Sequence, residues 1–127
     1  MDSSVLFVTP YPQDGRSLAK MLNDIPVIHV RNLTEAAAML ESEKFDVVLT
    51  EANLEDGTWL DVLELTRAAG IELVVTDAWA DARFWATAIN QGAYDMLVQP
   101  FIRMEVSRVL AGACSRPAVM KVHAAAC

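Results

Sequence analysis

The sequence predicts an α/β domain: an open five-stranded parallel sheet with helices on both faces, formed by a βα unit repeated five times. Three observations predict this fold. Short apolar runs alternate with helical patterns, at roughly 20–25 residues per unit. The apolar runs are continuous, which is typical of strands buried on both faces. The 127 residues, 54% of them apolar, suffice for one well-filled core and leave no room for two.

The first two units lie in the N-terminal third of the chain. The run Val5–Val8 is too short for a helix and is followed by a Thr-Pro pair, so it is predicted as a strand. Leucine and methionine then recur at three- and four-residue spacing over 18–22, which predicts a helix after Pro12. A second strand is expected at Val27–Val30, and strong helix formers predict a second helix over 34–41.

The last three units repeat this order, with glycine or proline at several boundaries. Strands are predicted at Val47–Leu49, 73–75 and 96–98, and helices at 59–70, 84–92 and from Pro100 onward. We place the domain at residues 1–115. The tail, 116–127, shows no clear amphipathic pattern, so we expect a helix extension or a linker there.

Composition and charge narrow the functional classes. Seventeen acidic against ten basic side chains give a net charge of −7, which disfavours a domain that binds nucleic acid on its own. No apolar run approaches the roughly 20 residues that span a bilayer, and the N-terminus lacks the basic start of a secretory signal. Cys114 and Cys127 do not have metal-ligand spacing, so we expect a cytoplasmic, reduced protein without structural disulfides.

In a sheet of this type, functional side chains lie beyond the carboxyl ends of the strands. Each predicted strand is short, so the rule selects only a few positions. They are Thr9 and Pro10 after the first strand, Glu51 to Asn53 after the third, Thr76 and Asp77 after the fourth, and Gln99 and Pro100 after the fifth.

Two segments carry a family resemblance. DVVLTEANLEDGTWLDVLELTR at 46–67 resembles a phosphoacceptor strand with its following loop, and INQGAYDMLVQPF at 89–101 resembles a Gly-Ala…Leu-Val-Lys-Pro-Phe segment. With the order and spacing of the apolar runs, residues 4–114 resemble the receiver domain of two-component response regulators, the CheY-like family. The resemblance implies a flavodoxin-like fold and a role in bacterial two-component (phosphorelay) signal transduction.

The resemblance also implies a chemistry, the transfer of a phosphoryl group from a histidine kinase to an aspartate of the receiver. Two acids after the first strand and the acceptor aspartate after the third hold Mg²⁺. A Thr or Ser after the fourth strand and a Lys after the fifth complete the family's site. The negative charge of the phosphoryl group explains why these residue types are needed, because its oxygens must be surrounded by a divalent cation and a fixed positive charge.

Four positions depart from this pattern in the groups that carry charge. The acid pair falls on Thr9 and Pro10, neither of which is a carboxylate. The acceptor falls on Glu51, one methylene longer than aspartate, and the lysine falls on the uncharged Gln99. We therefore expect Mg²⁺ binding to be lost or weak, with no metal or other cofactor in the site.

The remaining site positions are mixed. Thr76 matches the family's hydroxyl residue, and Asn53 occupies the position whose backbone carbonyl is a metal ligand in the family. Asp77 stands where a small residue is usual, and Met96 stands where the family has an aromatic switch residue. Without that ring, the coupling between the site and the signalling face is expected to be weakened.

Two aspartates are interpreted as helix caps. Asp77 could replace a missing metal ligand, but an aspartate before a helical run is a common N-cap, so we predict that it caps a helix that begins near Trp79. By the same reasoning Asp56 is predicted to cap the helix that begins at Thr58.

The favoured hypothesis is a degenerate receiver domain without enzymatic activity, acting as a phosphorylation-independent module for protein interaction or dimerisation. Glu51 is then either a mimic of the phosphorylated aspartate or a drifted acid in a solvated crevice. The alternative is a conventional receiver with weak, Mg²⁺-dependent phosphorylation at Glu51. A ligand-sensing flavodoxin-like domain is less favoured, because the loop 9–15 has no glycine-rich phosphate cradle.

The resemblance implies a partner surface on the fourth helix, fifth strand and fifth helix. Around the fourth helix, Trp79, Trp85 and Ile89 supply more apolar bulk than one buried face needs. On the last helix, Arg103 and Arg108 are candidates for a charged rim around that apolar surface. We expect a kinase, an output domain or a second copy of the chain as the partner, and no contact with nucleic acid or membrane.

Overall fold

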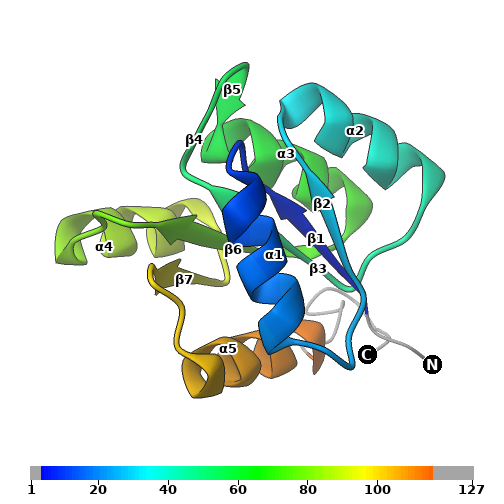
Figure 1. Cartoon of the computed structure of the whole chain (residues 1–127). Helices are drawn as coiled ribbons and strands as arrows, with labels where there is room; N and C mark the ends of the chain where they lie inside the picture. Colours follow the sequence, from blue (N-terminus) through cyan, green and yellow to red (C-terminus); the bar gives the residue numbers. More distant parts are fainter. Residues whose placement is uncertain (1–3, 116–127) are drawn as a thin grey trace.

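A computed structural model describes residues 4–115 and confirms the predicted α/β fold (Figure 1). Five parallel strands form one sheet in the order β2-β1-β3-β6-β7. The sheet strands are β1 (Val5–Val8), β2 (Val27–Val30), β3 (Val47–Glu51), β6 (Glu72–Asp77) and β7 (Asp95–Val98). The helices are α1 (Pro12–Met21), α2 (Leu33–Ser42), α3 (Trp59–Ala69), α4 (Ala82–Gln91) and α5 (Arg103–Ser115). The predicted tail at 116–127 lies outside the described residues.

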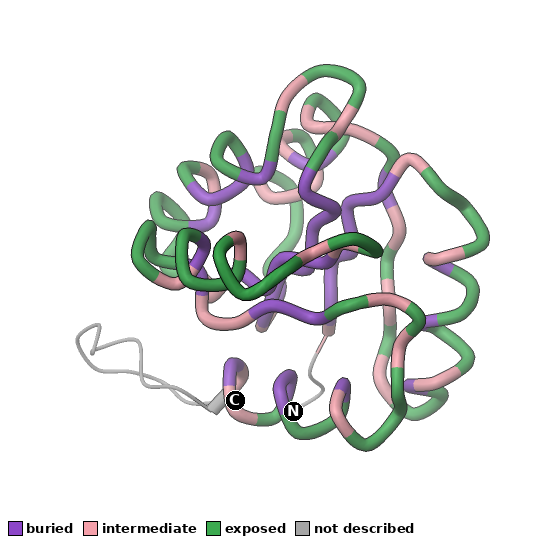
Figure 2. Tube along the Cα trace, turned by 90° about the vertical axis from the view of Figure 1, so that its left-hand side faces the viewer, coloured by how far each residue is buried: buried purple, intermediate pink, exposed green. Residues whose placement is uncertain are grey.

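Two apolar cores lie on opposite faces of the sheet. Leu6 and Val48 belong to the core that α2, α3 and α4 cover. Phe7 and Leu49, one position further along the same strands, belong to the core that α1 and α5 cover. Because neighbouring strand residues point to opposite faces and both faces are buried, the strands read as unbroken apolar runs. Figure 2 shows the consequence: exposed residues gather on the outer turns of the helices and on the loops.

The parallel register brings the carboxyl ends of the central strands to one edge. Glu51, the last residue of β3, pairs with Thr76 of β6, and Asp77 of β6 pairs with Val98 of β7. Just beyond β7, the backbone N–H of Gln99 donates to the carbonyl of Asp77 at 3.2 Å. The segments that follow β3, β6 and β7 therefore meet at the edge where the sequence predicts the site.

The cap predicted for Asp77 is wrong. α4 begins at Ala82, and Asp81 is its N-cap, with a side-chain oxygen that accepts from the backbone N–H of Phe84 at 2.9 Å. Asp77 is instead the last residue of β6. The physical reason is distance along the chain, because a capping side chain reaches only the N–H groups two or three residues beyond it.

The cap predicted for Asp56 is also wrong. Thr58 is the N-cap of α3, and its hydroxyl accepts from the backbone N–H of Leu60 at 3.2 Å. Asp56 reaches a different helix, where its carboxylate accepts from the backbone N–H groups of Leu33 and Thr34 at 2.7 and 3.0 Å. It therefore stabilises the start of α2 by satisfying donors that a helix terminus leaves unpaired.

Three further features were not predicted. A short antiparallel hairpin, β4 (Asn53–Leu54) with β5 (Gly57–Thr58), follows β3, and two-residue strands are too short to show periodicity. α5 begins at Arg103 and not at Pro100, after a cis peptide bond between Gln99 and Pro100. Cys114 is disulfide-bonded, which corrects the expectation of a chain without disulfides.

Within residues 4–115, no helix has the length and apolar character needed to cross a membrane.

Candidate functional site

A groove with a volume of about 530 Å³ lies at the carboxyl edge of the sheet. Four of the positions that the strand-edge rule selects line it: Glu51, Asp77, Gln99 and Pro100. The other side chains that line it come from the segment after β1, the start of α1, and the loop after β6; they are Tyr11, Gln13, Asp14, Ala78 and Trp79. Three of the nine are carboxylic acids, and none of the nine is a lysine, arginine or histidine.

Glu51 lies at the inner end of this groove. As the last residue of the central strand β3, it pairs with Thr76 of β6, and only 5% of its surface is exposed. Its carboxylate oxygen Oε2 accepts a hydrogen bond of 2.9 Å from Nε2 of Gln99. A buried carboxyl needs such a partner, because burial removes the water that would otherwise solvate it.

Gln99 joins this acid to a second one. The same nitrogen, Nε2, donates to Oδ2 of Asp14 at 3.1 Å, so one amide group bridges β3 and the first turn of α1. An amide nitrogen carries two hydrogens, and both are used in this bridge. Asp14 was not predicted as a site residue. The signal that could have found it is its place in the first helical turn after β1, since that turn begins at the carboxyl edge of the sheet.

The environment of Glu51 favours its protonated form and raises its pKa from 4.5 to about 7. Burial is the largest cause, because it disfavours the charged carboxylate. The hydrogen bond from Gln99 acts in the opposite direction, since it stabilises the charged form. Asp14 raises the pKa again, by its negative charge and by its side-chain hydrogen bond with Glu51, and the charge of Asp77 adds to this. Glu51 therefore titrates close to neutral pH.

The remaining predicted site residues do not line the groove. Thr9 is fully buried, and its hydroxyl accepts from the backbone N–H of Tyr11 at 3.1 Å. The hydroxyl of Thr76 lies 3.5 Å from the carbonyl oxygen of Thr50, to which it donates. Three others lie apart from it: Pro10 follows Thr9, Asn53 is exposed in β4, and Met96 is buried in the core under α3 and α4.

Solved structures with the same architecture include receiver domains of bacterial signalling proteins. The receiver domain of an HD domain-containing protein from Pseudomonas fluorescens matches 89% of this chain and 94% of its own, with a TM-score of 0.79 and 22% identity. A two-component response regulator from Clostridium difficile matches 91% of this chain and 98% of its own, with a TM-score of 0.81 and 19% identity. By its fold, the chain is similar to response-regulator receiver domains.

A sequence comparison also finds a bacterial regulatory protein. The chain is 32% identical over 113 residues to the swarming motility regulation protein RssB of Serratia marcescens. The match covers 85% of this chain and 52% of that protein, so the chain spans about half the length of this curated relative. No protein-family model matches the sequence.

Mg²⁺ is the ion that the receiver fold implies, and the residues of the groove do not fit it. The Gln99 amide points its hydrogens at Glu51 and Asp14, so the oxygens that would face a cation already accept from nitrogen. Glu51 also holds a proton up to about pH 7, whereas a metal ligand must be ionised. Across residues 4–115, no group of three or more acidic, histidine or cysteine side chains is arranged to hold a metal ion.

A second feature of the domain is an apolar surface beside the groove. Trp79, in the loop before α4, is 89% exposed, and Trp85 on α4 is 49% exposed. The indole nitrogen of Trp85 donates to Asp95 of the edge strand β7 at 3.2 Å, which ties α4 to that strand. Ile89 is half-buried, and Arg108 on α5 is exposed. Further large apolar side chains are exposed nearby in the sequence: Val98, Ile102 and Met104.

Proposed function

We propose that this receiver domain is a phosphorylation-independent interaction module of a bacterial two-component pathway, with its partner surface held in one state. The observation that carries this proposal is the bridge from Gln99 to Glu51 and Asp14. The neutral amide takes the place where the family has a lysine. It binds the two carboxyls to each other without supplying the positive charge that a transferred phosphoryl group requires.

The acids of the groove support the same conclusion. Glu51 is one methylene longer than the family's aspartate, is 5% exposed and is protonated up to about pH 7. A protonated carboxyl is a poor nucleophile for phosphoryl transfer, because the attacking oxygen must be ionised. We propose that Glu51 is a structural acid of a closed crevice and that the domain has no enzymatic activity of its own.

The proposed partner surface consists of Trp79, Trp85, Ile89 and the edge strand β7. Trp79 and Trp85 are both exposed and lie six positions apart in the sequence, and aromatic side chains are enriched at interface centres. We propose that this surface binds a protein of the same pathway or a second copy of the chain, in the cytoplasm, without direct contact with nucleic acid or membrane. Arg108 is the candidate for its charged rim.

One observation favours the alternative, a receiver with weak Mg²⁺-dependent phosphorylation at Glu51. Asp14, Glu51 and Asp77 give the groove three acids, which is more than the sequence predicted. The two proposals differ in what a phosphodonor does to association. We expect the sedimentation coefficient of the full chain to be the same with and without acetyl phosphate and Mg²⁺. A shift that requires both reagents would favour the alternative.

A further inference from the structure

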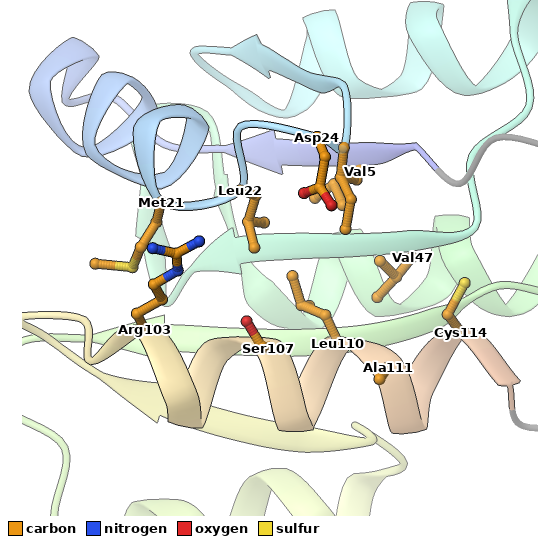
Figure 3. Close-up of a pocket in the computed structure, with 11 residues that line it drawn as sticks. Val5, Met21, Leu22, Asp24, Val47, Arg103, Ser107, Leu110, Ala111 and Cys114 are labelled. Carbon is orange, nitrogen blue, oxygen red and sulfur yellow. The ribbon is translucent and has the colours of Figure 1, made fainter.

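A second cavity lies at the opposite, amino-terminal edge of the sheet, between α1 and α5 (Figure 3). Its volume is about 420 Å³, which falls within the range of roughly 300–1,000 Å³ that is typical of small-molecule sites. It shares no residue with the groove at Glu51. Its occupancy is therefore a separate question from the proposed function of the receiver domain.

The floor of this cavity is apolar and formed by the core itself. Val5 and Val47 come from the first residues of β1 and β3, Leu22 follows α1, and Leu110 comes from α5. Each of these four side chains is at most 4% exposed, so their positions are fixed by packing on several sides. An apolar group placed on this floor would lose its contact with water without requiring the core to rearrange.

The rim carries two charges of opposite sign that are not paired. Asp24, in the loop between α1 and β2, and Arg103, at the start of α5, both line the cavity and are both exposed. Neither has an ion pair or hydrogen bond with any other described residue. In the view of Figure 3 the Leu22 side chain lies between the Arg103 guanidinium and the Asp24 carboxylate. Ser107 of α5 adds a hydroxyl to the same rim.

We infer that this cavity binds a small zwitterion with an apolar body, that is, an apolar amino acid or a very short apolar peptide. Its carboxylate would accept from the Arg103 guanidinium, its ammonium group would donate to Asp24, and its side chain would lie on the floor of Val5, Val47 and Leu110. An arginine-carboxylate pair is a strong, directional contact. A purely anionic ligand would be repelled by Asp24, and a purely cationic one by Arg103.

The cavity also differs from a protein-docking groove. An apolar helix laid on it would cover Asp24 and Arg103 and would leave both charges without water or a partner, which is costly. A zwitterion satisfies both charges with two groups that lie a few ångströms apart on one small molecule. Charge complementarity therefore favours the small zwitterion over an apolar helix.

The test is a titration of the full chain with L-leucine, followed by backbone amide NMR shifts. We expect saturable shifts at Val5, Val47 and Leu110, with a dissociation constant of about 1 mM for so small a ligand. Two analogues isolate the charges: 4-methylpentanoate lacks the ammonium group, and 3-methylbutylamine lacks the carboxylate. Both should bind at least about tenfold more weakly, because each loses one charge-assisted contact.

Matched variants locate the site. Arg103→Gln and Asp24→Asn should each weaken leucine binding about tenfold, whereas Arg16→Gln, exposed on α1 but outside the cavity, should bind as the wild type does. Both target side chains are exposed, so these variants should fold. The inference is overturned if leucine causes no saturable shift, if either analogue binds as tightly as leucine, or if Arg103→Gln binds unchanged. It is also overturned if the cavity residues shift with protein concentration alone, which would mean that a second copy occupies the cavity.

Discussion

Gln99 donates a hydrogen bond of 2.9 Å to Glu51, and this contact fixes the position of the buried carboxyl in the groove. The donor is an amide, so it orders the carboxyl without neutralising it. The same nitrogen also binds Asp14, which keeps a second acid close to the first. Burial and these neighbours leave Glu51 with a pKa of about 7. The groove therefore holds a proton where the family's pattern holds a magnesium ion and a lysine.

The raised pKa of Glu51 predicts a stability that falls with increasing pH. The unfolded chain ionises Glu51 near pH 4.5 and the folded chain near pH 7, so the folded state binds the proton more tightly. The contribution of this proton to the free energy of unfolding is full below about pH 4.5 and is lost between pH 4.5 and 7, a fall of about 3 kcal/mol. Glu51→Gln should remove this dependence. Urea unfolding at pH 4 to 8 measures it.

The exposed Glu64 on α3 supplies the matched control for that experiment, because it lies outside the groove. Glu64→Gln should keep the wild-type slope of stability against pH. If Glu51→Gln keeps that slope as well, Glu51 does not hold the proton that the geometry assigns to it.

A positive charge at position 99 should counteract the upward shift in the pKa of Glu51. Gln99→Lys places an ammonium group beside the carboxylate, which favours its ionised form and should lower the pKa of Glu51 toward its ordinary value. Gln99→Ala, which removes the only contact that lowers this pKa, should raise it further. Side-chain carbonyl NMR shifts of Glu51 across the pH range measure both variants. A lower pKa in Gln99→Ala would contradict the account.

Magnesium should not bind in the groove at up to about 1 mM, because the acid pair falls on Thr9 and Pro10 and Gln99 occupies the oxygens of Glu51 and Asp14. Amide NMR shifts during a MgCl₂ titration at pH 8, where Glu51 is ionised, give the most demanding test. Saturable shifts confined to Glu51 and its neighbours below about 1 mM would contradict this expectation.

Association should depend on the tryptophans beside α4. Trp85→Glu or Trp79→Glu should weaken self-association or partner binding by about 1–3 kcal/mol if the side chain lies at the centre of the interface. Leu60→Glu is the control, since Leu60 is 45% exposed on α3, outside the proposed surface. Sedimentation equilibrium measures self-association. Equal effects of Leu60→Glu and Trp85→Glu would show that the loss is not specific to this surface.

The elements could be predicted from sequence because each leaves a local pattern. The continuous apolar run of Val5–Val8 reports burial on both faces of a strand, and Gly70 ends α3 in the left-handed conformation that glycine adopts without strain. The short hairpin at Asn53–Thr58 leaves no such pattern. The hairpin places Asp56 against the start of α2, which is more than twenty positions away in the chain. Such a long-range contact could not be predicted from the local sequence pattern.

The site was predicted in part for the same reason. Glu51, Asp77 and Gln99 follow strands, and the edge rule finds any residue in that position. Asp14 lies one turn into a helix, and its contact with Gln99 joins residues 85 positions apart. The position of the Arg103 side chain could not be predicted from the sequence either. We expected it on the charged rim of the partner surface beside Arg108, but it lines the cavity between α1 and α5.

The most direct test of the central claim is the mass of the intact chain after incubation with acetyl phosphate and Mg²⁺. The account predicts an unchanged mass for the wild type and also for Glu51→Asp, because the missing acid pair and the missing lysine are separate defects that a shorter acid does not repair. A phosphorylated species that hydroxylamine removes from the wild type, as expected for an acyl phosphate at Glu51, would contradict it.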